Sequence, residues 1–263
     1  MSVYELRHDF QEMVYSSPSN SNSRFTCIDS EDDDEELLDV DEDPKQRWLD
    51  NVERAQQLGW REPIFAYCPN FKGYAWRLCT NWFETIPSFD RPIKYLEIGT
   101  LCGANLISVC KTYGKHPDSR FEVIDPWCDH DEYNEYLTPD DAPINVQDSN
   151  YKCFLDNIAS VNEQHRVKIY RDFSYDVLLY LTEEDYDLIY IDGNHNPEYV
   201  LEDSVLAFRK LKIGGWMVFD DYEWVDEHQR GPKLAIDSFL KTYSHRLQNI
   251  IVIRGQAFAQ KIR

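Results

Sequence analysis

The chain has 263 residues, 42% of them hydrophobic, which is enough for at least one sizeable folded core. Its formal net charge is -21 at pH 7, and the charge stays negative when the eleven acidic residues between positions 29 and 43 are left out. A negatively charged body repels nucleic-acid phosphates, so broad nucleic-acid binding is not expected.

The cysteines and the hydropathy bear on the compartment. The seven cysteines include no Cys-x-x-Cys pair and no regular spacing, which argues against a disulfide framework or a zinc ribbon and favours a reducing compartment. The N-terminus lacks the basic and then apolar pattern of a secretory signal, and no apolar run approaches about 18 residues. We therefore expect a soluble, cytoplasmic protein without a membrane segment.

The first 92 residues differ in composition from the rest of the chain. Residues 1–44 contain a serine- and asparagine-rich stretch and an unbroken acidic block at 31–36, a composition typical of a disordered acidic tail. Such a tail either only solvates the protein or docks a basic partner. Residues 45–92 predict a helical lid or flank, with one helix over 46–58 and another over 71–85.

From residue 93 onward the pattern alternates between strand and helix. Strands are predicted at residues 93–98, 120–124, 167–170, 186–191 and 216–219, and helices at 104–112, 151–162 and 233–243. An irregular acidic insertion is expected over 126–150. Two last strands, at 249–254 and 257–262, predict a closing antiparallel hairpin. The fold class is therefore α/β, a Rossmann-like doubly wound sheet of seven strands within a domain spanning 93–263.

One further helix is predicted after residue 196. Asn196 is a suitable N-cap, Pro197 suits the first helical position, and Gly214-Gly215 is expected to stop the helix. Its buried face is expected to consist of Leu201, Val205, Phe208 and Leu211.

A glycine turn follows the first predicted strand. Residues 97–103 read Glu-Ile-Gly-Thr-Leu-Cys-Gly, so an apolar strand ends in an acid and two glycines lead into a helix. Glycines permit close backbone approaches that a Cβ would block. The spacing differs from the dinucleotide fingerprint Gly-x-Gly-x-x-Gly and from a Walker loop. The stretch is therefore either a loop for a nucleotide-like cofactor or a plain strand-to-helix turn.

Acidic residues stand at the end of five predicted strands. They are Glu97, Asp125, Asp172, Asp192 and the pair Asp220-Asp221. Ligands of open α/β sheets bind beyond these strand ends, and an acid after the second strand commonly hydrogen-bonds ribose hydroxyls. If the fourth and fifth strands are neighbours, three carboxylates converge, and a hard cation such as Mg²⁺ or Mn²⁺ would offset their charge. The alternative is that one aspartate contacts a cofactor while the others cap turns or helices.

Three phrases support a family resemblance. They are Ile-Asp-Pro-Trp at 124–127, Tyr-Ile-Asp-Gly-Asn-His at 190–195 and Gly-Gly-Trp-Met-Val-Phe-Asp-Asp-Tyr at 214–222. With the glycine turn and the closing hairpin, they make residues 93–262 resemble class I S-adenosylmethionine-dependent methyltransferases. The chain is most similar to the macrocin, mycinamicin and novobiocin type of sugar O-methyltransferase. The acidic tail has no counterpart in that pattern.

The resemblance implies a set of site residues. S-adenosylmethionine would be bound by Glu97, Gly99, Thr100, Gly103 and Asp125, and on the adenine side by Asp172 and Phe173. A divalent metal, Mg²⁺ or Mn²⁺, would be held by Asp192, Asp220 and Asp221. The catalytic residues would be His195, as general base, and Asp192.

The function implied is methyl transfer to a hydroxyl of a sugar or other small diol. An imidazole with an ordinary pKa near 6.5 takes up a hydroxyl proton near neutral pH, whereas the plainer alternative is that His195 only hydrogen-bonds at the start of its helix. Two other functions stay open, namely metal-independent methylation of another acceptor and a non-catalytic binding module of the same fold. A nicotinamide dehydrogenase is disfavoured by the glycine spacing and the terminal hairpin. The acceptor is expected to be a small molecule or a glycan, and the sequence leaves open whether the chain forms a homo-oligomer.

Overall fold

The computed structural model describes residues 26–27, 64–73, 75, 77–128, 146–226 and 228–263. The acidic tail other than residues 26–27, the helix expected over 46–58 and most of the insertion expected over 126–150 lie outside the described residues. Among the helices that are described, none is long and apolar enough to cross a membrane.

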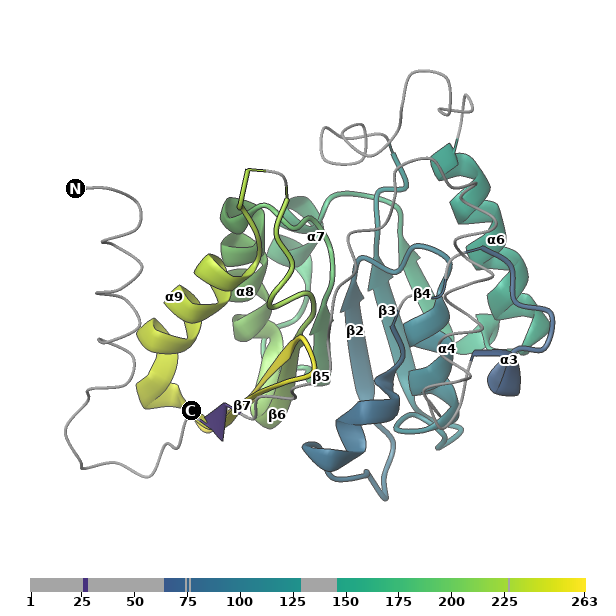
Figure 1. The fold of residues 1–263 in the computed structure, drawn as a ribbon. Coiled ribbons are helices and arrows are strands. Elements are labelled where there is room, and N and C mark those ends of the chain that lie inside the picture. The colour runs from purple at the N-terminus through teal and green to yellow at the C-terminus, as the bar shows by residue number, and fades with distance from the viewer. Residues whose placement is uncertain (1–25, 28–63, 74, 76, 129–145, 227) are drawn as a thin grey trace.

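One mixed sheet organises the described residues (Figure 1). Its strands lie in the order β1-β7-β8-β6-β5-β2-β3-β4. Their bounds are β1 Thr26–Cys27, β2 Lys94–Ile98, β3 Arg120–Ile124, β4 Val167–Tyr170, β5 Tyr186–Ile191, β6 Leu211–Phe219, β7 Leu247–Ile253 and β8 Gln256–Lys261. Strands β2 to β6 are mutually parallel, and β8 runs antiparallel to both β6 and β7. The predicted seven-stranded, doubly wound α/β sheet with a terminal antiparallel hairpin is confirmed, and the two-residue β1 adds a parallel edge to β7.

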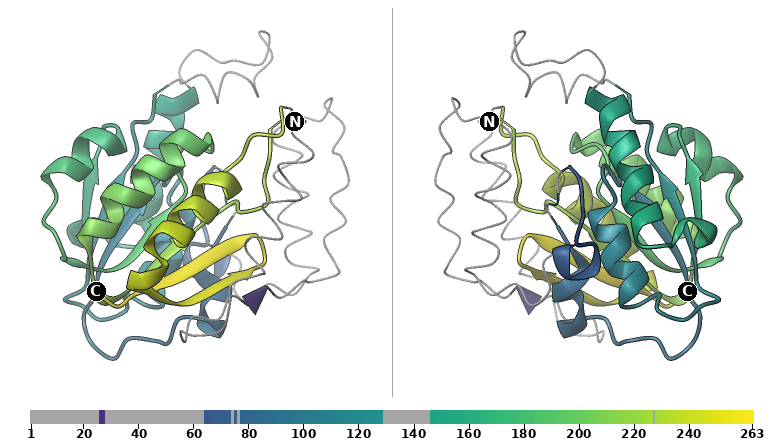
Figure 2. Two further views of the ribbon diagram at one scale, coloured as in Figure 1. Left: turned by 90° about the vertical axis from the view of Figure 1, so that its left-hand side faces the viewer. Right: turned by 90° about the vertical axis from the view of Figure 1, so that its right-hand side faces the viewer.

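Helices cover both faces of the sheet, as the two side views show (Figure 2). On one face lie α3 Ile64–Tyr67, η1 Cys79–Glu84, α4 Ala104–Lys111 and α6 Val146–Ser160, and on the other lie α7 Ser174–Tyr180, α8 Pro197–Lys210 and α9 Lys233–Tyr243. Two short 3₁₀ turns, η2 Gln164–Arg166 and η3 Ser244–Arg246, precede β4 and β7. Successive strand residues point to opposite faces, so Tyr95 packs in the first layer and Leu96 in the second. The central parallel strands are buried on both sides and therefore read as apolar runs.

The backbone ladder continues one residue beyond the parallel strands. Four amide groups at the carboxyl ends donate to the last carbonyl of the neighbouring strand at 2.8 to 3.1 Å. The bonds run from Asp125 to Tyr170, from Gly99 to Ile124, from Asp192 to Ile98 and from Asp220 to Ile191. These residues therefore form one line across four neighbouring strands.

The helix expected over 71–85 is not present. In this stretch the described residues are helical only in the 3₁₀ turn η1, and Gly73 adopts a left-handed φ of +82°. The backbone instead finds distant partners, because the amide of Lys72 donates to Asn157 Oδ1 at 2.8 Å and that of Cys79 to Ser108 Oγ at 3.1 Å. These two amides therefore bond to side chains of α6 and α4 and not to carbonyls of a helix of their own.

The buried face of α8 also differs from the prediction. Phe208 is buried as expected, but Leu201 is 38% exposed, and Val200 and Ala207 occupy the core instead. The sequence did not reveal this buried face because it includes a polar residue. Ser204 lies on it, and its hydroxyl donates to the carbonyl of Val200 at 2.5 Å.

The end of α8 differs in the same way. The helix ends at Lys210, and β6 begins at once with Leu211, well before the predicted stop at Gly214-Gly215. Leu211 is therefore buried as a strand residue, paired with Tyr186 of β5.

Gly99 and Gly214 form a matched pair of glycines for a test of the close approach at the cofactor loop. Both have positive φ, +78° and +84°, but a Cβ at Gly99 would lie 1.8 Å from the Asp192 carbonyl oxygen, whereas one at Gly214 meets nothing within 4 Å. Gly214→Ala should cost about 1–2 kcal/mol for the left-handed conformation alone. Gly99→Ala should cost at least about 2 kcal/mol more because backbone must move. Urea unfolding of both variants measures the difference, and equal losses would mean that the close approach is not constrained.

Candidate active site

The glycine loop sits where β2 lies beside β5. Gly99 follows β2 directly, and its missing side chain lets the loop lie against the backbone of Asp192, which follows β5. Gly103 caps the N-terminus of α4 with a φ of +84°, and a Cβ there would lie 3.0 Å from the ring of Phe154. Both glycines are therefore required by the geometry and not only tolerated.

Asp125 ties the loops after β2 and β3 together. Its Oδ2 accepts the amides of Thr100 and Leu101 at 3.0 and 2.9 Å, and its Oδ1 accepts the amide of Trp127 at 2.9 Å. Three backbone amides therefore fix the position of this carboxylate.

Glu97 is a buried carboxyl group at the end of β2, only 1% exposed. It accepts hydrogen bonds from the Tyr95 hydroxyl at 2.5 Å and the Asn105 amide at 3.1 Å, and it has no ion pair among the described residues. Burial raises the pKa of Glu97 to about 7, against the effect of these hydrogen bonds. The site is therefore prepared for a cationic group that would stabilise the ionised form.

Asp220 is held by three donors at the end of β6. Its Oδ2 accepts the Tyr190 hydroxyl at 2.7 Å, its Oδ1 accepts the Gln256 amide at 2.9 Å, and Arg77 Nε lies 3.4 Å from Oδ1. The same Tyr190 hydroxyl lies 3.0 Å from Oδ2 of Asp192. Burial and the neighbouring carboxylates raise the pKa values of both Asp192 and Asp220.

Asp221 and His195 face each other beside this pair. His195 Nε2 lies 2.9 Å from Oδ2 of Asp221, and the imidazole packs against the ring of Trp224 with 4.6 Å between centroids. Burial acts to raise the pKa of Asp221, but the contact with His195 and the charges of His195 and Arg77 outweigh it, so that this pKa is lowered. Asp221 is therefore the carboxylate of the cluster that most readily stays ionised.

A divalent cation fits the donors at this position. One ligand atom each from Asp192, His195 and Asp221 lies within 4.8 Å of the others. Carboxylate oxygens with one imidazole suit Mn²⁺ or a similar divalent cation. Asp220 is the more enclosed neighbour, since both of its oxygens already have donors.

Comparisons with known proteins agree with this geometry. Residues 96–222 match a protein family described as a methyltransferase domain. This stretch belongs to that family. Together with the strand order, the match makes it a class I S-adenosylmethionine-dependent methyltransferase domain, as the resemblance implied.

Individual relatives are more distant. "Uncharacterized protein R132" of Acanthamoeba polyphaga mimivirus is 28% identical over 133 residues, which make up 50% of this chain and 52% of that protein. The chain thus matches about half the length of this curated relative. The O-methyltransferase NovP has a similar structure, with a TM-score of 0.50 and 17% identity over 65% of this chain and 73% of that one. The O-methyltransferase TomG from Streptomyces achromogenes, solved in complex with SAM, gives a TM-score of 0.48 and 17% identity over the same shares.

Most of the site residues predicted for the methyltransferase domain lie together. Glu97, Gly99, Thr100 and Asp125 form one continuous group around the loop after β2, and Asp192, His195, Asp220 and Asp221 form a second group beside it. Asp172 and Phe173 are exposed residues just after β4, the strand beside β3. There Asp172 accepts the amide of Phe173 at 2.9 Å, and the Phe173 ring stacks on Tyr175. The roles of all these residues remain predictions.

Three contributors were not predicted. Tyr190 could have been found, because it lies two residues before Asp192 on the same strand face. Gln256 reaches Asp220 only because β8 lies beside β6 in one particular register, which the sequence does not specify. Arg77 comes from the stretch that was expected to be a helix, so nothing in the pattern pointed to it.

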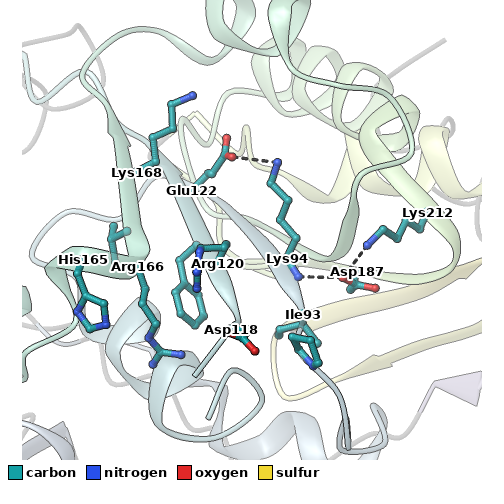
Figure 3. A pocket seen from close by; sticks show the side chains of 13 residues that line it. Ile93, Lys94, Asp118, Arg120, Glu122, His165, Arg166, Lys168, Asp187 and Lys212 are labelled. Atoms are coloured by element: carbon teal, nitrogen blue, oxygen red, sulfur yellow. Dashed lines mark hydrogen bonds and ion pairs between the residues drawn. The ribbon is translucent and has the colours of Figure 1, made fainter. Parts of the chain in front are cut away.

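A cavity of about 540 Å³ lies at the opposite edge of the sheet (Figure 3). It is lined by the amino ends of β2 to β6, and its charges are largely paired. Lys94 Nζ lies 3.0 Å from Glu122, and Lys212 Nζ lies 2.9 Å from Asp187. We interpret the charged residues around this cavity as a structural ion-pair network. We place the active site at the carboxyl ends of the strands, where ligands of such sheets bind.

The raised pKa of Glu97 predicts a pH-dependent stability. A carboxyl group with a raised folded-state pKa contributes stability below its unfolded pKa and loses it as the pH rises through the folded pKa. The stability of the wild type relative to Glu97→Gln should therefore fall by an amount on the order of 3 kcal/mol between about pH 4.5 and about pH 7. Urea unfolding across this pH range measures the effect, and a flat difference would contradict it.

Glu122→Gln provides a control with the opposite sign. Burial acts to raise the pKa of Glu122, but Lys94 and two tyrosine hydroxyls lower it overall. Its contribution is therefore present above the unfolded pKa and lost as the pH falls through the folded pKa.

Proposed function

We propose that the protein is an S-adenosylmethionine-dependent O-methyltransferase that acts on a hydroxyl of a sugar or other small diol, with Mg²⁺ or Mn²⁺ at the acidic cluster. The observation that carries this proposal is the contact of His195 with Asp221, beside Asp192 and next to the glycine loop. This arrangement brings a base to the place where the donor and the acceptor would meet.

The loop side of the site suits the methyl donor. Glu97 offers a buried carboxyl group without an ion pair among the described residues, which suits the cationic amino group of the donor. The close approach at Gly99 brings the glycine loop against the backbone of Asp192, so the donor side of the site adjoins the acidic cluster. Asp125 directly follows the second parallel strand, β3, where an acid commonly hydrogen-bonds ribose hydroxyls.

The cluster side suits an acceptor hydroxyl. His195 takes the hydroxyl proton, and the adjacent carboxylate of Asp221, with its lowered pKa, stabilises the imidazolium that results. Trp224 packs on the imidazole and restricts its orientation. A hydroxyl that has lost its proton in this way is a far better nucleophile than the neutral group.

A divalent cation has donors available in the same cluster. Asp192, Asp220 and Asp221 would hold it, which leaves the imidazole of His195 for the proton transfer. When bound, such a cation lowers the pKa of a hydroxyl that it contacts and fixes its orientation. The test of the whole proposal is incorporation of tritiated methyl from S-adenosylmethionine into small-molecule and glycan extracts. If calorimetry shows no binding of S-adenosylmethionine, the non-catalytic binding module would be the better reading.

His195→Gln should lower kcat by about 10²–10⁴-fold, because a general base contributes that much. The affinity for S-adenosylmethionine, measured by calorimetry, should stay within about two-fold, since His195 lies on the cluster side. His245→Gln, at an exposed position of η3, is the matched control. Wild-type turnover in the His195 variant would remove it as the base.

Removal of divalent cations with EDTA should lower turnover by at least about 10²-fold, since metal activation of a hydroxyl is worth several kcal/mol. Dialysis followed by addition of Mn²⁺ should restore turnover. Turnover that is unaffected by EDTA would show metal-independent methyl transfer and leave the rest of the proposal in place.

A further inference from the structure

Arg77 reaches into the acidic cluster from the N-terminal flank. Its Nε lies 3.4 Å from Oδ1 of Asp220, and one terminal nitrogen lies 3.9 Å from Oδ1 of Asp221. The other terminal nitrogen donates to the carbonyl of Arg254 at 3.3 Å. The side chain therefore lies between the two carboxylates and the turn of the β7–β8 hairpin.

Groups of the hairpin turn and of the acidic cluster surround the guanidinium of Arg77. A Cβ at Gly255 would lie 2.9 Å from its terminal nitrogen, so the guanidinium packs closely against the hairpin turn. Burial opposes the charge of Arg77, but the carboxylates of Asp220 and Asp221 outweigh it and raise its pKa. Among the described residues, Arg77 is the arginine or lysine that forms an ion pair with these two aspartates.

We propose that Arg77 is a built-in counter-cation of Asp220 and Asp221 that competes with a divalent cation for this pair and thereby sets the metal affinity of the site. The inference rests on the proposed function, which places the metal in the same cluster. Asp220 accepts two neutral donors and lies beside one charged group, the guanidinium of Arg77. A divalent cation at this carboxylate would repel that guanidinium, so the cation and Arg77 compete for Asp220.

The competition is reciprocal. A cation that weakens the contact of Arg77 is itself weakened by Arg77 to the same degree. The N-terminal flank and the hairpin turn, which hold Arg77 in place, are thereby coupled to metal binding at the strand ends.

The experiment is a Mn²⁺ titration of the full chain followed by electron paramagnetic resonance, with Mn²⁺ as the only ligand. The acidic tail can also bind Mn²⁺, so the site-specific part is defined as the binding that Asp221→Asn abolishes. Arg77→Gln should bind Mn²⁺ at that site on the order of 10-fold more tightly than the wild type. Arg91→Gln, which removes the same charge from an ion pair with Asp187 at the opposite edge of the sheet, should stay within about two-fold. Arg77→Lys, which keeps the charge, should lie closer to the wild type than Arg77→Gln does.

Equal or weaker binding by Arg77→Gln would overturn the proposal, and so would the absence of site-specific Mn²⁺ binding in every variant. In either case the tritium assay reports separately on methyl transfer, so a failure of this inference is distinguishable from a failure of the proposed function. Thermal unfolding and S-adenosylmethionine affinity check that each variant is folded. If Arg77→Gln does not fold, a Mn²⁺ affinity of Arg77→Lys below that of the wild type by more than about two-fold would overturn the competition.

Discussion

The line of backbone hydrogen bonds at the carboxyl ends of the parallel strands is the constraint on which the site depends. Each amide just beyond a strand donates to the last carbonyl of the neighbouring strand. Gly99, Asp125, Asp192 and Asp220 are therefore fixed relative to one another by main chain alone. The side chains of Asp125, Asp192 and Asp220 therefore all start from this line at the carboxyl edge of the sheet. The placement of these acids depends on the register of the strands, since shifting one strand by one residue would turn its acid to the other face of the sheet.

The same hydrogen bonds bring several carboxyl groups close together. The groups that offset their negative charge differ from one carboxylate to the next. Around Asp220, neutral donors and one arginine surround the carboxylate, whereas Asp221 is beside an imidazole. Glu97, by contrast, has no ion pair among the described residues, and burial raises its pKa against the effect of its hydrogen bonds. A buried carboxyl group of this kind reduces the stability of the unliganded fold near neutral pH. Such local conflicts between stability and polarity are expected at functional sites.

The sequence predicted the sheet better than it predicted the surroundings of the site. Strand bounds at 120–124, 167–170 and 186–191 were correct because buried parallel strands read as apolar runs that end in turn residues. The acids at the strand ends followed from the same signal. The contributions of Arg77 and Gln256 could not be predicted, because each depends on a contact between segments more than 30 residues apart in sequence. The helix predicted over 71–85 was wrong for a related reason. The amides of Lys72 and Cys79 donate to side chains of α6 and α4 and not to carbonyls within a helix.

The two halves of the site differ in where their positive charge comes from. At Glu97 the described chain supplies no cation, so under the proposed function the cationic group of the methyl donor would supply the positive charge. At Asp220 and Asp221 the chain supplies Arg77, so any cation that binds there must first compete with a group already in place. Under the proposed function, binding of the methyl donor would therefore add a positive charge beside Glu97. Binding of a metal ion would instead replace the positive charge of Arg77 beside Asp220 and Asp221. Because Arg77 is held by the hairpin turn at Arg254 and Gly255, this exchange reaches the closing strands of the sheet. The terminal antiparallel hairpin thus contributes to the chemistry of the site as well as to the architecture of the sheet.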